Sequence, residues 1–204
     1  VKYPIHGVST SSYQNVFNFI NAGSIQKESN KIYVNALQSI NLSLKEGDKV
    51  ALIGGNGAGK STLLRVMSGI YHPTDGKIHT KGRKFCILGT GFGMEEDATG
   101  YENIALSGIV SGLSIKEAKS IIPEIEDFTE LGEYLNMPIR TYSAGMRARL
   151  AFAITTAVFP DILLIDEGIG AGDSSFISKA KKRMENFIQN SSILVVASHS
   201  TDLI

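Results

Sequence analysis

The chain has 204 residues, enough to bury a sizeable core as one domain or as a core with a subdomain. Its 20 acidic and 20 basic residues balance, which excludes the basic footprint of a nucleic-acid binder and of a helix suited to an anionic membrane surface. No apolar run approaches the roughly 20 residues of a membrane span, and the single cysteine, Cys86, cannot form an internal disulfide, which fits an inert core thiol in a reducing compartment.

The N-terminal part of the sequence combines helix and strand signals. The pattern between residues 9 and 30 favours a short amphipathic helix. Ile40, Leu42 and Leu44 alternate with polar residues, as in a half-buried strand. The later segment 76–88 is typical of a second strand pair closed by a turn.

A glycine-rich loop occupies residues 54–62, between an apolar run and an amphipathic segment. It has the pattern G-x-x-x-x-G-K-S; residues 49–53 predict a buried strand before it, and apolar residues recur at helical spacing over 63–70. Such a loop turns successive backbone N–H groups towards phosphate oxygens, and the helix dipole adds attraction. Lys60 would contact the β- and γ-phosphates and Ser61 would bind Mg²⁺. A glycine-rich turn without a ligand is the alternative, which the flanking elements disfavour. The expected nucleotide-binding residues here are Gly54, Asn56, Gly57, Ala58, Gly59, Lys60, Ser61 and Thr62.

The middle of the chain is expected to be helical. Thr99 and Glu102 have the spacing of a capping box ahead of an apolar stripe. Ser114 is expected to precede a second helix, and Ser143 is expected to cap a third. The acidic run 95–97 could engage a basic patch on a partner, but such runs are usually solvated, and we expect that here.

The last part returns to alternating strands and helices. Residues 162–165 and 193–197 predict buried strands, and an apolar stripe over 176–188 predicts the helix between them. This order implies a parallel sheet with ligands outside the carboxyl ends of its strands.

Three polar residues follow these two strands. Asp166 is expected to bind Mg²⁺, and Glu167 to act as general base for the attacking water. His199 would contact the γ-phosphate through an imidazole N–H. Alone, a strand ending in Asp-Glu usually just meets solvent, and a histidine after a strand is usually a surface residue. The phosphate-binding loop upstream favours the catalytic interpretation.

Together these patterns predict an α/β fold in one domain, with a P-loop nucleoside-triphosphatase core and a mostly parallel sheet, an antiparallel β subdomain and an inserted α-helical subdomain. The expected boundaries are roughly 1–47 and 76–88 for the antiparallel part, 48–75 and 159–204 for the core, and 89–158 for the helical part.

At residues 142–146 the chain resembles the ATP-binding-cassette ATPases, whose signature Leu-Ser-Gly-Gly-Gln lies ahead of a helix. Ser143 and Gly145 match that signature and the other three positions depart. Asp173 matches the family's D-loop aspartate. The resemblance covers essentially the whole chain and implies ATP hydrolysis with Mg²⁺ in a homodimer. In this family the serine loop meets the γ-phosphate of ATP bound to the partner subunit.

The resemblance also implies an aromatic residue that stacks on adenine and a glutamine that touches Mg²⁺ and the γ-phosphate. Tyr33 is the candidate for the first role, with a packed or surface tyrosine as the alternative. Residues 87–101 contain no glutamine for the second role. Backbone or water in the 90–93 loop would then substitute.

Softer motifs are similar to the nucleotide-binding subunits of bacterial exporters of O-antigen, capsule and teichoic acid. They are residues 4–9, 89–92, 99–103 and 142–150. This similarity implies a multi-span membrane permease partner contacted by residues 89–113, a lipid-linked polysaccharide as the transported substrate, no nucleic acid, and a peripheral location at the cytoplasmic face of the bacterial inner membrane. Some members append a C-terminal carbohydrate-binding domain. Because the sequence begins at Val1 rather than Met and stops soon after a strand, we expect a trimmed fragment, which would lack that domain.

Three other functions remain open on the sequence. An ATPase of a different transporter would share the same motifs. A soluble cassette protein acting on DNA or ribosomes usually has long coiled-coil insertions, tandem cassettes or basic patches, none of which occurs in this sequence. A nucleotide switch with little turnover fits poorly with the set Lys60, Asp166, Glu167 and His199.

Overall fold

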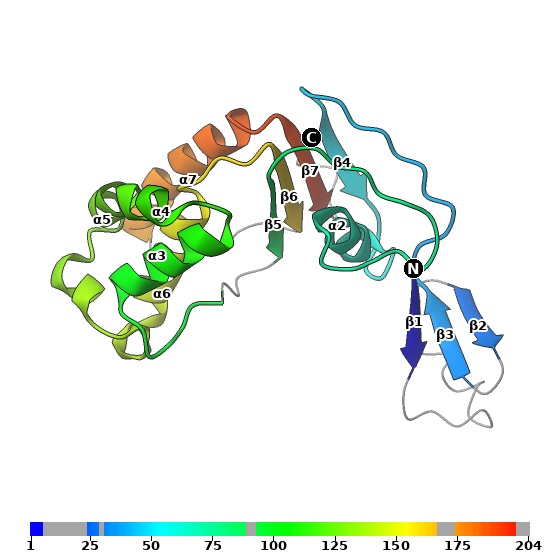
Figure 1. Ribbon diagram of the computed structural model, residues 1–204, viewed down its shortest axis with the longest axis horizontal. Coiled ribbons are helices and arrows are strands. Elements are labelled where there is room, and N and C mark those ends of the chain that lie inside the picture. The colour runs from blue at the N-terminus through cyan, green and yellow to red at the C-terminus, as the bar shows by residue number, and fades with distance from the viewer. Residues whose placement is uncertain (6–23, 29–30, 89–92, 167–173, 199–204) are drawn as a thin grey trace. The chain divides into compact units, whose positions relative to one another are not determined.

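The computed structural model describes residues 1–5, 24–28, 31–88, 93–166 and 174–198. The expected site residues Glu167, Asp173 and His199 lie outside this part. The chain divides into two compact units (Figure 1). The first comprises Val1–Leu88, Asp161–Gly168 and Ser192–Ile204, and the second comprises Gly89–Pro160 and Ile169–Ser191.

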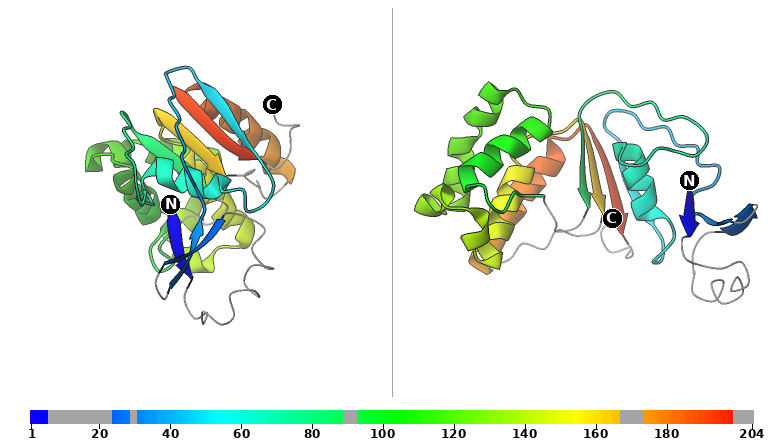
Figure 2. Two further views of the ribbon diagram at one scale, coloured as in Figure 1. Left: turned by 90° about the vertical axis from the view of Figure 1, so that its right-hand side faces the viewer. Right: turned by 60° about the horizontal axis from the view of Figure 1, so that its bottom comes forward.

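The first unit contains a parallel sheet of four strands in the order β4-β7-β6-β5. Their bounds are Lys49–Ile53 for β4, Lys84–Leu88 for β5, Ile162–Asp166 for β6 and Ile193–Ser198 for β7. Helix α2, Lys60–Ser68, buries Leu64 against Leu164 and Val195 of the sheet. Figure 2 shows the four strands side by side with α2 on one face. The expected α/β class with a parallel sheet is therefore confirmed.

A second, antiparallel sheet lies at the N-terminal end of the same unit. It has the order β1-β3-β2, with β1 at Lys2–Ile5, β2 at Ser24–Glu28 and β3 at Lys31–Asn35. The amphipathic helix expected between residues 9 and 30 is wrong over Ser24–Glu28, because those residues pair with β3. Residues 6–23 lie outside the described part.

Two strand expectations in the first unit are wrong. In the segment 76–88 only Lys84–Leu88 is a strand, and it pairs parallel with β6. The reason is visible in its composition: Phe85, Cys86 and Ile87 form a continuous apolar run, as buried parallel strands do. The alternating segment that includes Ile40 and Leu42 is not a strand either, and these two side chains are 53% and 48% exposed. Alternation predicts a strand only where a neighbour supplies hydrogen bonds.

The second unit is helical. Its α-helices are α3 (Gly100–Val110), α4 (Ile115–Ser120), α5 (Ile122–Thr129), α6 (Ala144–Thr155) and α7 (Ser174–Gln189), with short 3-10 turns at Gly132–Asn136 and Ile139–Thr141. Phe128, Phe152 and Phe176 pack together at its centre, with ring centroids 5.1 to 6.2 Å apart. Phe176 belongs to α7, which lies within the range 159–204 expected for the P-loop core. Its ring packs instead among the helices of the second unit.

Local capping chemistry explains where these helices begin. Thr99 accepts a hydrogen bond from the backbone N–H of Glu102, and the Glu102 carboxylate accepts one from the Thr99 N–H. These hydrogen bonds hold the pKa of the Glu102 carboxyl below its usual range. Ser114 and Glu117 repeat the arrangement at α4. Both predicted helix starts are confirmed.

Helices α3 and α4 approach each other closely at Gly108. A Cβ atom at this position would lie 2.9 Å from the Ala118 Cβ and 3.2 Å from the Ala118 Cα. We expect Gly108→Ala to lower the free energy of unfolding by about 1–2 kcal/mol, because overpacking outweighs the gain in helix propensity. Urea denaturation measures this. The control is Gly145→Ala, where the nearest atom is 3.9 Å away and stability should not fall. Equal stability of Gly108→Ala and wild type would contradict the close approach.

Among the described helices, none is both long enough and apolar enough to cross a membrane.

Candidate functional site

The glycine-rich loop joins β4 to α2 in the first unit, as the sequence predicts. Gly57 and Gly59 have φ angles of +79° and +93°, a region that favours glycine. A Cβ atom at Gly59 would also lie 2.8 Å from the carbonyl oxygen of Ala36. Two independent constraints therefore require glycine at position 59, and the segment after β3 lies too close to the loop to leave room for a side chain there.

The loop presents polar groups suited to an anion. Lys60 Nζ donates hydrogen bonds to the carbonyl oxygens of Gly54 (2.6 Å) and Gly55 (3.1 Å), so its ammonium group lies against the loop. The backbone N–H groups of Lys60 and Ser61 lie in the first turn of α2, and no residue in the described part of the chain accepts a hydrogen bond from them. First-turn N–H groups at a helix N-terminus attract phosphate, so this arrangement is compatible with the expected phosphate-binding role, which stays a prediction.

The parallel register brings Asp166 to the same edge of the sheet. Asp166 ends β6 and is opposite Ala197 of β7, while Ile53, which ends β4, is opposite Ser198. Asp166 and Ser61 are both half-buried. A carboxylate and a hydroxyl are hard oxygen donors that fit Mg²⁺, which takes few protein ligands and keeps water or phosphate oxygens for the rest. Within the described residues, no group of three or more His, Cys, Asp or Glu side chains forms a closed metal cage.

Cys86 is the central residue of β5 and is opposite Leu164 of β6. Burial is the main cause that raises the pKa of its thiol to about 11, and the negative charge of Asp166 adds to the shift. The thiol is therefore almost entirely protonated at neutral pH, which supports the interpretation of Cys86 as an inert packed residue.

Tyr33 is half-buried in β3, where it pairs with Pro4 and Gln26. It precedes by three residues the Ala36 carbonyl that touches the Gly59 position. This neighbourhood is compatible with a ligand held by the loop, and the adenine-stacking role stays a prediction.

The second unit contains the serine of the signature-like segment. Ser143 is the N-cap of α6, and its Oγ accepts a hydrogen bond from the backbone N–H of Met146 at 3.2 Å. Ser143, Ala144 and Gly145 are all exposed. The start of α6 thus presents a hydroxyl and first-turn N–H groups to solvent, which is a second place for an anion.

The acidic run 95–97 is not simply solvated, contrary to the expectation from sequence. Glu96 Oε1 lies 3.1 Å from Arg147 Nη1, and Asp97 forms an ion pair with Arg140. Both acidic side chains remain largely exposed, so each ion pair alone is weak. Together the two ion pairs connect the acidic run to Arg140 and Arg147, which lie on either side of Ser143 in the sequence.

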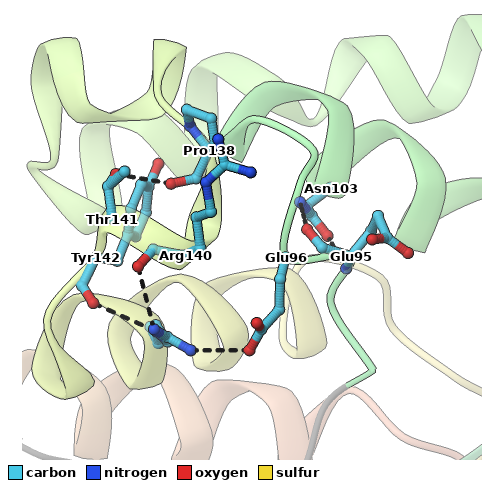
Figure 3. Close-up of polar contacts among 8 residues, drawn as sticks. Glu95, Glu96, Asn103, Pro138, Arg140, Thr141 and Tyr142 are labelled. Atoms are coloured by element: carbon cyan, nitrogen blue, oxygen red, sulfur yellow. Dashed lines mark hydrogen bonds and ion pairs between the residues drawn. The ribbon is translucent and has the colours of Figure 1, made fainter.

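Asn103 holds the backbone of the same acidic run through its side-chain amide, a role that the sequence does not predict. Its side chain is 2% exposed, donates to the carbonyl oxygens of Glu95, Ala98 and Thr99, and accepts from the Glu95 N–H at 2.8 Å. Figure 3 shows the Asn103 amide paired with Glu95. Asn103 ends the motif 99–103, but its role has a different sequence signal, a polar residue inside an apolar helical stripe, which is typical of a buried asparagine with several backbone partners.

The structure therefore brings the glycine-rich loop, Ser61 and Asp166 together in the first unit, and places Ser143 and Gly145 at the start of α6 in the second. Tyr33 lies in the strand that leads towards Gly59. Glu167, Asp173 and His199 lie outside the described residues, so their expected roles stay predictions.

Comparison with known proteins gives consistent results. A family profile described as ABC transporter matches residues 37–170. The O-antigen export system ATP-binding protein RfbE of Yersinia enterocolitica is 46% identical over 100% of this chain and 86% of its own length. The teichoic acids export ATP-binding protein TagH of Bacillus cereus is 38% identical over 86% of this chain, which spans 32% of that longer protein. Among solved structures, the dimeric bacterial ABC transporter cassette MJ0796 matches with a TM-score of 0.62 and 26% identity, over 90% of this chain and 88% of its own.

Proposed function

The chain belongs to the ABC transporter family, and from that premise we propose that it is the ATP-hydrolysing subunit of a bacterial exporter of cell-surface polysaccharide. One observation supports this proposal above the others. Two helix N-termini of the chain have the features that suit a phosphate, the glycine-rich loop ahead of α2 and the serine-capped start of α6. Relatives of the chain are, by their names, ATP-binding proteins that serve the export of O-antigen and teichoic acids.

The residues of the first unit would bind ATP and prepare it for hydrolysis. Lys60 and the first-turn N–H groups of α2 would hold the phosphates, and Tyr33 would stack on adenine. Ser61 and Asp166 would hold Mg²⁺, which supplies charge neutralisation between the phosphates when bound.

Two residues beyond the described part complete the hydrolytic step in this proposal. Glu167 would take the proton from the attacking water as general base. His199 would donate an imidazole N–H hydrogen bond to the γ-phosphate and stabilise its developing charge.

The second unit would act on the ATP bound to another copy. Ser143 and Gly145 would contact that γ-phosphate through the serine hydroxyl and a backbone N–H, and Asp173 would lie at the dimer interface. The dimeric state of the related cassette supports this arrangement. ATP would then bind one conformation of the dimer more tightly than the other, and hydrolysis would reverse that preference.

An exposed apolar patch on α3 and α4 supports a membrane partner. Leu106, Ile109, Val110 and Ile115 are 49%, 45%, 87% and 66% exposed. Apolar side chains gathered at the surface mark interaction sites. We propose that this patch receives a cytoplasmic segment of a multi-span membrane permease, through which a lipid-linked polysaccharide passes. The protein would then be peripheral at the cytoplasmic face of the inner membrane.

Co-purification of the full-length protein with the membrane subunit tests the proposal. Val110→Asp is expected to reduce the recovered complex by about tenfold, because a charge replaces a desolvated apolar contact. ATP turnover of the free subunit should stay unchanged. Ile177→Asp, at a side chain 47% exposed on α7, is the matched control and should co-purify normally. Mass spectrometry of the wild-type complex should identify a bound glycolipid. Equal recovery of the Val110→Asp complex would overturn the assignment of the patch, and absence of any membrane partner would overturn the export function.

A further inference from the structure

The segment 95–98 runs beside the segment that leads into Ser143. The Ile139 N–H donates to the Ala98 carbonyl oxygen and the Arg140 N–H donates to the Glu96 carbonyl oxygen, each at 3.0 Å. An isolated bridge between Thr99 and Pro138 extends the pairing. The backbone before the α6 N-terminus is therefore fixed against the segment before α3.

Arg147, in the first turn of α6, adds side-chain contacts to this backbone pairing. Its guanidinium group reaches Glu96 Oε1 at 3.1 Å, the Tyr142 carbonyl oxygen at 3.3 Å and the Arg140 carbonyl oxygen at 3.4 Å. Figure 3 shows dashed contacts running to Glu96, Arg140 and Tyr142. One planar group thus holds the acidic segment and two carbonyls of the approach to Ser143 at once.

Tyr142 is anchored independently on its other side. Its ring is 4% exposed, and its hydroxyl donates to the Tyr134 carbonyl oxygen at 2.5 Å. Burial raises the pKa of this hydroxyl, so it stays a donor at neutral pH. The residue before Ser143 therefore has a fixed side chain, and its carbonyl is held by Arg147. Little freedom remains for Ser143 itself.

We propose that Arg147 is a positioning residue that fixes Ser143 and the N-terminus of α6 for contact with the γ-phosphate of ATP held by a second copy of the chain. This inference rests on the proposed function and deepens it. The role favours arginine, because Nε, Nη1 and Nη2 of one rigid planar group each reach a different acceptor. A lysine ammonium also has three donors, but all three are on one nitrogen and cannot span the same three acceptors.

The proposal predicts a separation between ATP binding and turnover. Arg147→Ala is expected to lower kcat by about tenfold, since hydrogen bonds to charged groups have this order of effect on a barrier. The affinity of the free subunit for ATP should stay within about twofold of wild type, because the glycine-rich loop is untouched. Arg147→Lys should not restore kcat. Glu96→Gln keeps the carbonyl contacts and should lower kcat by only about threefold.

The matched control is Lys179→Ala. Lys179 makes the same kinds of contact within the same unit, an ion pair with Glu130 at 2.6 Å and a hydrogen bond to the Asp127 carbonyl oxygen at 3.2 Å, but it touches nothing near Ser143. Its removal should leave kcat within about twofold of wild type. This comparison separates a positioning effect from the general loss of one exposed ion pair.

Full-length variants, with phosphate release and fluorescent-nucleotide binding as readouts, test the inference. The decisive arm mixes Arg147→Ala with Lys60→Ala and compares the recovered turnover with a mixture of Ser143→Ala and Lys60→Ala. Equal recovery supports action on the partner's ATP. Unchanged kcat, a parallel loss of ATP affinity, or no recovery where the Ser143→Ala mixture recovers would each overturn the inference. If wild-type protein does not hydrolyse ATP, the proposed function fails instead.

Discussion

Mixing two inactive variants, Lys60→Ala and Ser143→Ala, should restore ATP turnover. Each variant alone forms dimers in which both composite sites are defective. A mixed dimer has one intact site, with the glycine-rich loop from the Ser143→Ala copy and the serine loop from the Lys60→Ala copy. Random pairing makes half of the dimers mixed, so the expected recovery is about a quarter of wild-type turnover, against a loss of roughly 100-fold or more for each parent.

Phosphate release measured across mixing ratios checks this result. The negative control mixes Lys60→Ala with Asp166→Ala. Lys60 and Asp166 belong to the same unit and serve the same ATP, so every site in that mixed dimer keeps one defect. Recovered turnover in the control mixture would contradict the shared ATP site. So would the absence of recovered turnover in the test mixture, if the two variants are shown to bind one another.

Glu167→Gln should trap an ATP-bound dimer. Glutamine keeps the size of the side chain but cannot accept the proton of the attacking water, so turnover should fall by about 100- to 10,000-fold. ATP then stays bound, and the closed dimer persists because the step that reopens it is blocked. Sedimentation with ATP should show a dimer, whereas ADP should not produce it.

A double variant separates trapping from unspecific association. Adding Lys60→Ala to Glu167→Gln removes a phosphate contact and should return the protein to the behaviour seen without ATP. Normal turnover by Glu167→Gln alone would remove Glu167 from its assigned role and leave another group to activate the water.

Local chemistry explains which features the sequence predicted well. The glycine-rich loop, the capping residues Thr99 and Ser114, and the Ser143 cap each depend on groups a few residues apart, and each lies where it was expected. Glycine at 59 was predicted from a motif, while the structure adds a second reason, the Ala36 carbonyl beside it.

Long-range pairing explains the errors. The turn within the segment 76–88 predicts an antiparallel strand pair, but the strand of this segment pairs in parallel with β6. Likewise, nothing near residues 95–97 in the sequence indicates that Arg140 and Arg147 will reach them. An acidic run in a sequence predicts hydrated side chains, and only the fold shows which basic residues lie close enough to pair with them.

The protonated state of Cys86 has a practical consequence for following two copies of the chain in solution. With a thiol pKa of about 11, only about one molecule in ten thousand is a thiolate at pH 7. The native thiol is therefore expected to react slowly with maleimide dyes. A cysteine introduced at Val110, which is 87% exposed, would take the label almost alone. Energy transfer between such labels could report the closing and opening of a dimer without removing the native thiol.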